Sequence, residues 1–271
     1  MDLGLKGKRA LVTGSSSGIG VGIAQVLLEE GCDVVVHGRQ VEKTQAVADS
    51  LKHLGNVKVA LGDLALKDGA DNAAKMALEA FGGLDILINN AGGNGTSDHV
   101  GFFNISPEEW AETHASNIIS TVNMIHRITP QMKELGWGRI VQISSFAAHS
   151  NTGTIPAYTA TKSALLNMTL GLAKTLKHTG ITVNAVSPGI IETERLDNYF
   201  YSIAAQQGFT GPERRREAID WLLANVMPQT VKRLGTPDDV GRMVAYVCSP
   251  AADFVSAANL RIDGGASPSS N

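Results

Sequence analysis

The sequence predicts an α/β fold: a doubly wound parallel sheet of seven strands within a single domain over residues 1–271. Short apolar segments of strand length alternate along the chain with longer segments of helical periodicity, and this alternation favours parallel strands joined by right-handed helical crossovers. The composition agrees, because 43% hydrophobic and 18% charged residues are typical of a globular protein with an extensive core.

The predicted strands are short and apolar, as strands covered on both faces of a sheet are. They occupy residues 9–13, 33–37, 57–61, 84–88, 139–143, 181–186 and 259–262. Helices are predicted over residues 18–30, 41–53, 68–81, 157–178 and 238–248, and over 108–135, which is long enough for one helix or two. Gly31 follows the first helix as a typical C′ residue, and Thr236-Pro237 begins the last.

One region interrupts the alternation. Residues 193–232 contain two prolines, two glycines and a helix-like patch from Glu213 to Val226. Long excursions of this kind are usually functional, so we expect a substrate lid here. The small, polar tail over 266–271 is expected to fray.

Charge and cysteine content exclude several classes of function. With 23 basic and 26 acidic residues the formal net charge is −3, so nucleic acid and membrane surfaces are not expected partners. Cys32 and Cys248 have neither a disulfide framework nor the spacing of a zinc site, and we expect no metal. Neither a membrane span nor a signal peptide is evident, and a cytoplasmic location is expected.

A glycine-rich turn follows the first predicted strand. Residues 13–20 read T-G-x-x-x-G-x-G and lead directly into a helix. A helix N-terminus presents unpaired N–H groups and a partial positive charge, and glycine lets a pyrophosphate approach the backbone. The spacing differs from the G-x-G-x-x-G of other dinucleotide-binding proteins.

The end of the second predicted strand bears on the choice of cofactor. A carboxylate there would accept hydrogen bonds from the ribose hydroxyls of NAD. The sequence is His37-Gly38-Arg39 instead, and the planar guanidinium of Arg39 suits a 2′-phosphate. We therefore favour NADP(H) over NAD(H), although neutral Ser17 offers no second basic contact.

Tyr158 and Lys162 lie four residues apart on one face of a predicted helix. A free tyrosine has a pKa of about 10, and a neighbouring ammonium favours the phenolate, so such a tyrosine can exchange a proton with a carbonyl or an alcohol. The pair alone is a weak signal. It gains weight because Asn89-Asn90-Ala91-Gly92, Ser144-Ser145 and Pro188-Gly189 all follow predicted strands, at the edge where open α/β sheets bind ligands.

In this order the motifs resemble the classical short-chain dehydrogenase/reductase family, over nearly the whole chain from Gly7 to Gly265. Residues 233–240 and 261–265 are similar to its β-ketoacyl-carrier-protein-reductase-like branch. Ala257 is a departure, because that branch usually has glycine there. The resemblance implies a Rossmann-like fold and a homotetramer.

The resemblance also implies roles for individual residues. Tyr158 would be the general acid/base, Lys162 would bind the nicotinamide ribose and lower the tyrosine pKa, and Ser145, rather than its neighbour Ser144, would hydrogen-bond the substrate oxygen. Asn117 would hold a water in a proton relay through the lysine. The expected cofactor contacts are Gly14, Ser16, Ser17, Gly18, Ile19, Gly20, Arg39, Asp63, Leu64, Asn90, Ala91, Gly92, Tyr158, Lys162, Pro188, Gly189, Ile191 and Thr193.

The resulting hypothesis is an NADP(H)-dependent oxidoreductase that interconverts a ketone and a secondary alcohol. Two alternatives stay open: an NAD-dependent alcohol dehydrogenase working oxidatively, and, more remotely, a non-catalytic cofactor sensor. We expect substrate specificity from the loop after Gly93, residues 146–155 and the lid. His149 is interpreted as an ordinary loop histidine, and Arg214–Arg216 as part of a solvated helix face.

Overall fold

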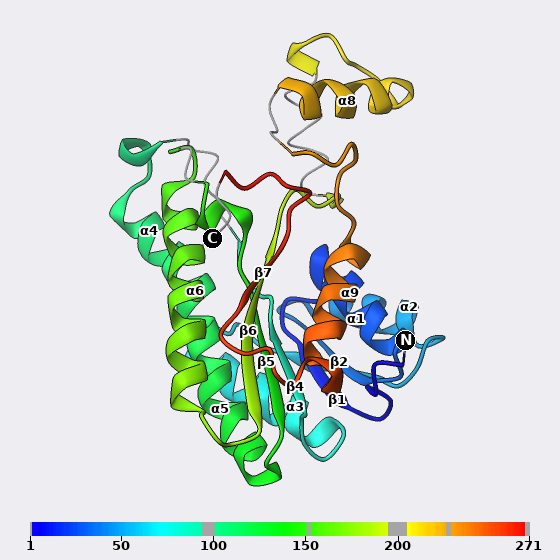
Figure 1. The fold of residues 1–271 in the computed structure, drawn as a ribbon, viewed down its shortest axis with the longest axis vertical. Coiled ribbons are helices and arrows are strands. Elements are labelled where there is room, and N and C mark those ends of the chain that lie inside the picture. Colours follow the sequence, from blue (N-terminus) through cyan, green and yellow to red (C-terminus); the bar gives the residue numbers. More distant parts are fainter. Residues whose placement is uncertain (1, 94–100, 151–152, 195–204, 226–228, 269–271) are drawn as a thin grey trace.

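The computed structural model describes residues 2–93, 101–150, 153–194, 205–225 and 229–268. Its centre is a sheet of seven parallel strands in the order β3-β2-β1-β4-β5-β6-β7, the predicted Rossmann-like arrangement in a single domain (Figure 1). The strands are β1 (Arg9–Val12), β2 (Asp33–Gly38), β3 (Val57–Leu61), β4 (Ile86–Asn89), β5 (Gly138–Ile143), β6 (Ile181–Pro188) and β7 (Asn259–Ile262). The strand order reverses between β1 and β4, and open α/β sheets bind ligands at such a point.

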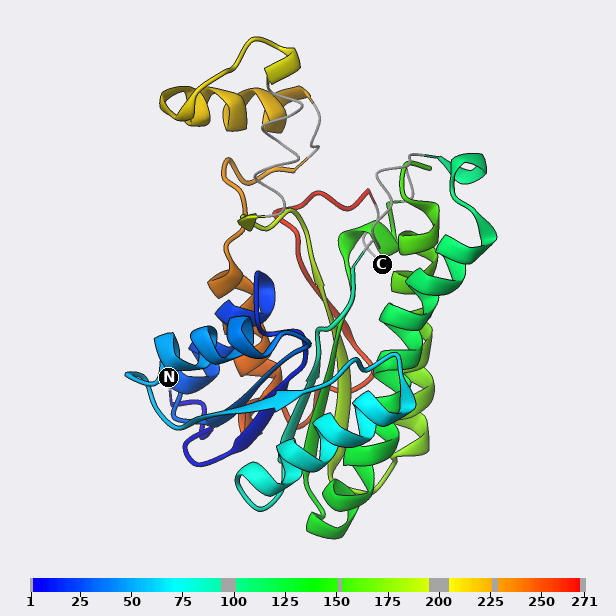
Figure 2. The same cartoon turned by 180° about the vertical axis from the view of Figure 1, so that it is seen from behind.

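Helices cover both faces of the sheet (Figures 1 and 2). α1 (Ile19–Glu29), α2 (Val41–Leu51) and α9 (Pro237–Cys248) pack on one face, and α3 (Lys67–Ala80), α5 (Ser120–Leu135) and α6 (Pro156–Thr175) pack on the other. α4 (Pro107–His114) precedes α5 along the chain. Alternate residues of each strand therefore enter different cores: Ala10 and Val12 face α1, whereas Leu11 faces α3 and α5.

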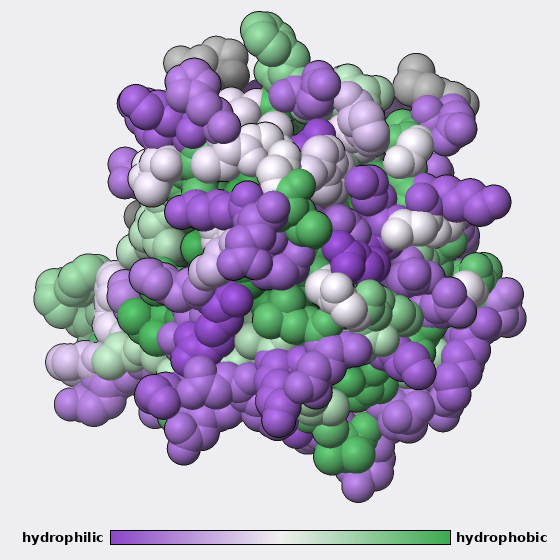
Figure 3. Space-filling view, turned by 90° about the horizontal axis from the view of Figure 1, so that it is seen from below, coloured by the Kyte–Doolittle hydropathy of each residue, from purple (hydrophilic) through white to green (hydrophobic). Residues whose placement is uncertain are grey.

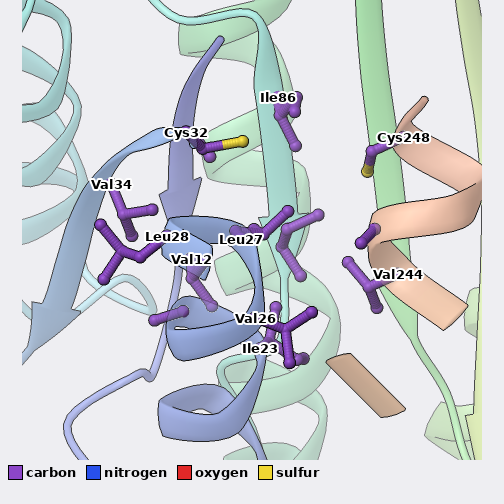
Figure 4. Close-up of a cluster of buried hydrophobic side chains, with 14 of the residues drawn as sticks. Val12, Ile23, Val26, Leu27, Leu28, Cys32, Val34, Ile86, Val244 and Cys248 are labelled. Carbon is purple, nitrogen blue, oxygen red and sulfur yellow. The ribbon is translucent and has the colours of Figure 1, made fainter. Parts of the chain in front are cut away.

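Figure 4 shows the first of these cores, in which Val26 and Leu27 of α1 lie between the strands and Val244 of α9. Two glycines allow α1 and α9 to approach closely. A Cβ atom on Gly22 would lie 2.3 Å from Cβ of Pro237, and one on Gly241 would lie 2.9 Å from the Gly22 carbonyl oxygen. The pairing of these helices fixes the start of α1, where the glycine-rich turn ends.

The predicted elements are present, with differences at their ends. Residues 107–135 form one continuous helical stretch in which a π-helical segment, Ala115–Ile119, joins α4 to α5. α6 ends at Thr175 instead of residue 178, because the chain turns through a left-handed His178 (φ 64°) and Gly180 to enter β6. β4 begins at Ile86, two residues later than predicted, and β6 continues to Pro188, two residues further.

Within the region predicted as a lid, a 3₁₀ turn at Pro212–Arg214 leads into α8 (Arg215–Asn225), in place of the predicted helix-like patch from Glu213 to Val226, whose last residue lies outside the described part of the chain. Both ribbon views place α8 away from the sheet, beyond the carboxyl ends of the strands (Figures 1 and 2). The opposite end of the molecule is mostly hydrophilic, with apolar side chains in small separate patches (Figure 3). Of the helices in the described ranges, none has both the length and the apolar character needed to cross a membrane.

Candidate active site

The loops after β1 and β4 are tied together at the switch point of the sheet. The Thr13 hydroxyl oxygen accepts hydrogen bonds from the backbone N–H groups of Asn90 (2.9 Å) and Ala91 (3.0 Å). In return, the Asn90 side-chain amide donates to the Thr13 carbonyl oxygen (2.9 Å) and to that of Gly14 (3.3 Å). Two segments that the sequence assigns to the cofactor therefore form one rigid unit, in which Thr13 has a role that sequence reasoning missed.

The glycine-rich turn has the shape needed to hold an anion. Gly14 (φ 65°) and Gly18 (φ 58°) have left-handed backbones, and a Cβ atom on Gly14 would lie 2.8 Å from Cα of Ala91. Gly18 is the N-cap of α1 and supplies no side-chain hydrogen bond to the first turn. Because the N–H groups of that turn lack a side-chain cap, the residues present fit a pyrophosphate.

Thr193 lies against this turn, since a Cβ atom on Gly18 would be 3.6 Å from its Cγ2 atom. The segment after β6 is also attached to β7 and to the residues before α9. Gly189 N–H donates to the Ile262 carbonyl oxygen (2.8 Å), and buried Ile191 forms a β-bridge with Gly235. The structure thus brings the segment from Pro188 to Thr193 to the glycine-rich turn, with Ile191 buried in the core.

Arg39 and Asp63 face each other beside the end of β2, with 3.6 Å between the guanidinium Nη1 and the carboxylate Oδ2. The Arg39 side chain is 75% exposed, so this pair is weak and Arg39 is accessible to a ligand. The Asp63 carboxylate also accepts from Ala65 N–H (3.0 Å), and Leu64 between them is buried. Ser16 lies at the same place, because a Cβ atom on Gly38 would be 2.8 Å from the Ser16 hydroxyl.

Tyr158 and Lys162 lie in the first two turns of α6, next to the end of β5. Lys162 is buried, and its ammonium donates to the Ile143 carbonyl oxygen (2.8 Å) and lies 5.4 Å from the centre of the Tyr158 ring. Burial lowers the pKa of Lys162 to about 8. The fold therefore keeps the positive charge of Lys162 beside the phenol of Tyr158, although removing that charge from water costs free energy.

The two serines after β5 are distinguished by their hydrogen bonds. The Ser144 hydroxyl donates to the main-chain carbonyl of Lys162 (2.9 Å). This bond uses the only proton of the hydroxyl and attaches α6 to the end of β5. The Ser145 oxygen accepts from Ala147 N–H (3.2 Å), an arrangement that leaves its proton free to donate. Ser145 is thus the residue suited to contact a substrate oxygen.

Asn117 lies in the π-helical segment and is buried. Its side-chain oxygen accepts from Gly93 N–H (2.7 Å), and its amide nitrogen donates to the Gly93 carbonyl (2.9 Å) and to the Thr161 hydroxyl (2.8 Å). The side chain thereby connects the loop after β4 to α6, one residue before Lys162. Gly92 needs its small size here, because a Cβ atom would lie 2.3 Å from the Asn117 side-chain oxygen.

The flanking segments hold two contacts that the sequence did not reveal. The Asn259 amide donates to Nε2 of His149 (2.8 Å), so this histidine joins the loop after β5 to β7. Arg215 pairs with Glu192, which connects α8 to the segment after β6. Arg214 and Arg216 pair within their own helical turns, as a solvated face does. Three parts of the expected specificity regions, residues 94–100, 151–152 and 195–204, lie outside the described residues.

Comparison with known proteins assigns the family. The family model for short chain dehydrogenase matches residues 8–202. The 3-oxoacyl-(acyl-carrier-protein) reductase FabG of Chlamydia pneumoniae is 31% identical over 266 residues, which cover 98% of this chain and 99% of the relative. D-beta-hydroxybutyrate dehydrogenase of Cupriavidus necator is 31% identical over 264 residues, with coverage of 96% and 98%.

Among solved structures, L-sorbose reductase from Gluconobacter frateurii, complexed with NADPH and L-sorbose, superposes with a TM-score of 0.88. It is 29% identical in sequence, and the match covers 99% of this chain and 100% of that one. The chain therefore belongs to the classical short-chain dehydrogenase/reductase family, and it is an oxidoreductase that acts on CH–OH groups.

Proposed function

We propose that this protein interconverts a ketone and a secondary alcohol with NADP(H), using Tyr158 as the general acid/base. One observation carries the proposal: buried Lys162 lies beside Tyr158 on α6, next to Ser145 at the end of β5. A bound nicotinamide supplies or accepts the hydride, and L-sorbose reductase shows that a protein of this fold takes NADPH.

Ser145, Tyr158 and Lys162 have different roles in the proposed proton transfer. In reduction, Ser145 donates a hydrogen bond to the substrate oxygen, and the Tyr158 hydroxyl transfers its proton to that oxygen as negative charge develops there. The Lys162 ammonium favours the phenolate that is left, and it retains two donors besides the one used by Ile143. In oxidation the same groups act in reverse.

Asn117 completes the proposed relay through its main chain. Its side-chain atoms already have partners in Gly93 and Thr161. The Asn117 carbonyl oxygen, which accepts from the Thr121 hydroxyl (2.9 Å), is the acceptor that we propose for the relay water. A water held there would return a proton to Tyr158 by way of Lys162.

The preference for NADP(H) rests on Arg39 and Gly38. Arg39 is exposed and can turn from Asp63 to a 2′-phosphate with two parallel hydrogen bonds. A carboxylate side chain at position 38, the arrangement suited to NAD, would place its Cβ atom 2.2 Å from the Thr44 hydroxyl. Arg39→Ala should therefore raise the Michaelis constant for NADPH and leave that for NADH unchanged.

The first experiment is a fluorescence titration with NADPH and NADH, followed by a panel of ketones with the tighter cofactor. We expect tighter binding of NADPH and turnover of at least one ketone of the panel. Tyr158→Phe should bind cofactor normally but lose turnover by at least about 100-fold, the lower range for a positioned acid/base. Tyr246→Phe, a partly exposed tyrosine on α9, is the matched control. Normal turnover by Tyr158→Phe would contradict the mechanism, and tighter NADH binding would favour the oxidative alternative.

We also propose that the chain forms a homotetramer, as the family resemblance implies. Fully exposed Phe254 supports a subunit contact near β7, which lies at the edge of the described sheet and pairs there with β6. Light scattering on the purified protein should give four times the mass of one chain.

A further inference from the structure

His37 is a buried histidine whose contacts all lead to the cofactor end of the sheet. It precedes the last residue of β2 and is 3% exposed. Its ring Nδ1 atom is 3.0 Å from the backbone nitrogen of Gly14, in the glycine-rich turn after β1. Its Nε2 atom is 3.0 Å from the Gly62 carbonyl oxygen, in the loop after β3. From its place in β2, one imidazole thus bridges the two loops that follow the neighbouring strands β1 and β3.

The direction of these hydrogen bonds fixes the state of the ring. A backbone N–H group can only donate, so Nδ1 must be the acceptor from Gly14. A carbonyl can only accept, so Nε2 must carry the proton and donate it to Gly62. Only a neutral imidazole with its proton on Nε2 makes both bonds, because an imidazolium has no acceptor.

A second contact reinforces the first. His37 N–H donates to the Ser15 hydroxyl oxygen (2.9 Å), and that hydroxyl donates to the Val12 carbonyl (2.7 Å). The residues on either side of the Gly14–Ser15 peptide bond are therefore both attached to β2 through His37. Since Gly14 is held in a left-handed conformation against Ala91, the path of the turn is fixed from two sides.

We propose that His37 is a positioning residue for the adenosine half of the cofactor. It holds the glycine-rich turn, which would receive the pyrophosphate, at a set distance from Gly62 and the adjacent Asp63, which would line the adenine. This inference rests on the proposed function, because it presupposes a dinucleotide at that turn. It assigns His37 to binding and not to the chemistry at Tyr158.

The charges around the ring are compatible with this role. Two charged side chains act on it: Arg39 from the loop that follows β2 and Asp63 from the loop that follows β3. The glycine-rich turn, residues 13–20, contains no titratable side chain. Burial lowers the pKa of His37 to about 4, against the opposing effects of the Gly62 hydrogen bond and Asp63, so the ring is neutral at physiological pH.

Three substitutions separate the two hydrogen bonds. His37→Asn keeps an oxygen near the position of Nδ1 and so preserves the acceptor for Gly14, whereas His37→Gln extends an amide nitrogen toward Gly62 and preserves that donor. His37→Leu preserves neither. His53→Asn is the matched control, because this exposed histidine after α2 contacts only the neighbouring Ser50 carbonyl among the hydrogen bonds that the structure describes.

The readouts are the dissociation constant for NADPH by fluorescence and the steady-state kinetics with a ketone. We expect His37→Leu to raise the dissociation constant by about tenfold, with kcat at saturating cofactor and KM for the ketone unchanged. His37→Asn should recover most of the affinity, and His53→Asn should match the wild type.

The outcomes distinguish this inference from the proposed function. Wild-type protein that binds neither NADPH nor NADH would refute the function itself. Wild-type protein that binds NADPH, alongside a folded His37→Leu variant of equal affinity, would overturn only the role of His37. Should the Leu variant not fold, the Asn and Gln variants decide: each keeps only one of the two hydrogen bonds, so the proposal requires both to bind NADPH more weakly than the wild type, and wild-type affinity in both would refute it.

Discussion

Replacing Lys162 by methionine should stabilise the cofactor-free protein while abolishing turnover. Burial lowers the pKa of Lys162 from the ordinary 10.5 to about 8. At about 1.36 kcal/mol per pKa unit, this shift means that the charged side chain costs the folded state about 3 kcal/mol at neutral pH. Methionine has a stem of similar length without the charge. The variant also loses the hydrogen bond to the Ile143 carbonyl, at a cost of about 1–2 kcal/mol.

The expected net gain is therefore about 1–2 kcal/mol, or roughly 4 °C in Tm for a chain of this size. The gain should depend on pH in a defined direction. Between pH 8 and 10.5 the unfolded state holds more protons than the folded state, so the wild type gains stability as the pH rises and Lys162 loses its charge. The methionine variant has no such group, so its advantage should be complete below pH 8 and shrink above it.

The assay is thermal unfolding by circular dichroism from pH 7 to 9.5, without cofactor, because a bound ligand that pairs with the ammonium would hide the cost. Lys174→Met, an exposed lysine on the same helix, controls for the loss of one positive charge. A lower Tm for Lys162→Met than for the wild type at pH 7, together with a difference in Tm that stays constant from pH 7 to 9.5, would refute the claim that the charge is held at a cost to stability.

Four further substitutions test the backbone strain at Ala257, the packing around two glycines and the ion pair of Asp85 with Arg9. Ala257 has a left-handed backbone (φ 64°), so Ala257→Gly should raise the free energy of unfolding by about 0.5–1 kcal/mol in urea titration, and a decrease would contradict the strain. Gly241→Ala should lower it by about 1–2 kcal/mol because its Cβ atom would meet Val26 at 2.7 Å, whereas Gly171→Ala, on an open helix surface, should raise it slightly. Burial alone would raise the pKa of Asp85, but hydrogen bonds from Arg9 lower it overall; Asp85→Asn should therefore cost about 1–3 kcal/mol at pH 7, and this deficit should narrow as pH falls below about 4.

The strands were predictable because each is covered on both faces, which makes its sequence an apolar run. The ends of the helices and strands were harder to predict from the sequence, because they depend on contacts with distant residues. α6 ends early because of the turn at His178, whose left-handed conformation is uncommon for any residue other than glycine. The π-helical segment is equally invisible in sequence, because it accompanies the bonds of Asn117 to Gly93 and Thr161.

The residues of the candidate site also differ in whether the sequence predicts them. Tyr158, Lys162 and the glycine-rich turn became candidates through their spacing together with the order of the motifs along the chain. Thr13 and His37 were not, although both are polar residues within or directly after apolar strands, and that signal was available. Ala257 shows the reverse case: it stands where the family branch usually has glycine, and its φ of 64° is a conformation that glycine adopts without strain.

The buried polar groups at the carboxyl edge of the sheet fall into two kinds. Thr13, Ser144 and Asn117 have their donors satisfied by backbone or side-chain acceptors, so they hold loops in place at little cost. Lys162 differs, because its charge is desolvated and a single carbonyl does not repay that loss. A fold selected for stability alone would place an apolar side chain there, so the cost of this charge is the physical reason to assign Lys162 to chemistry rather than to structure.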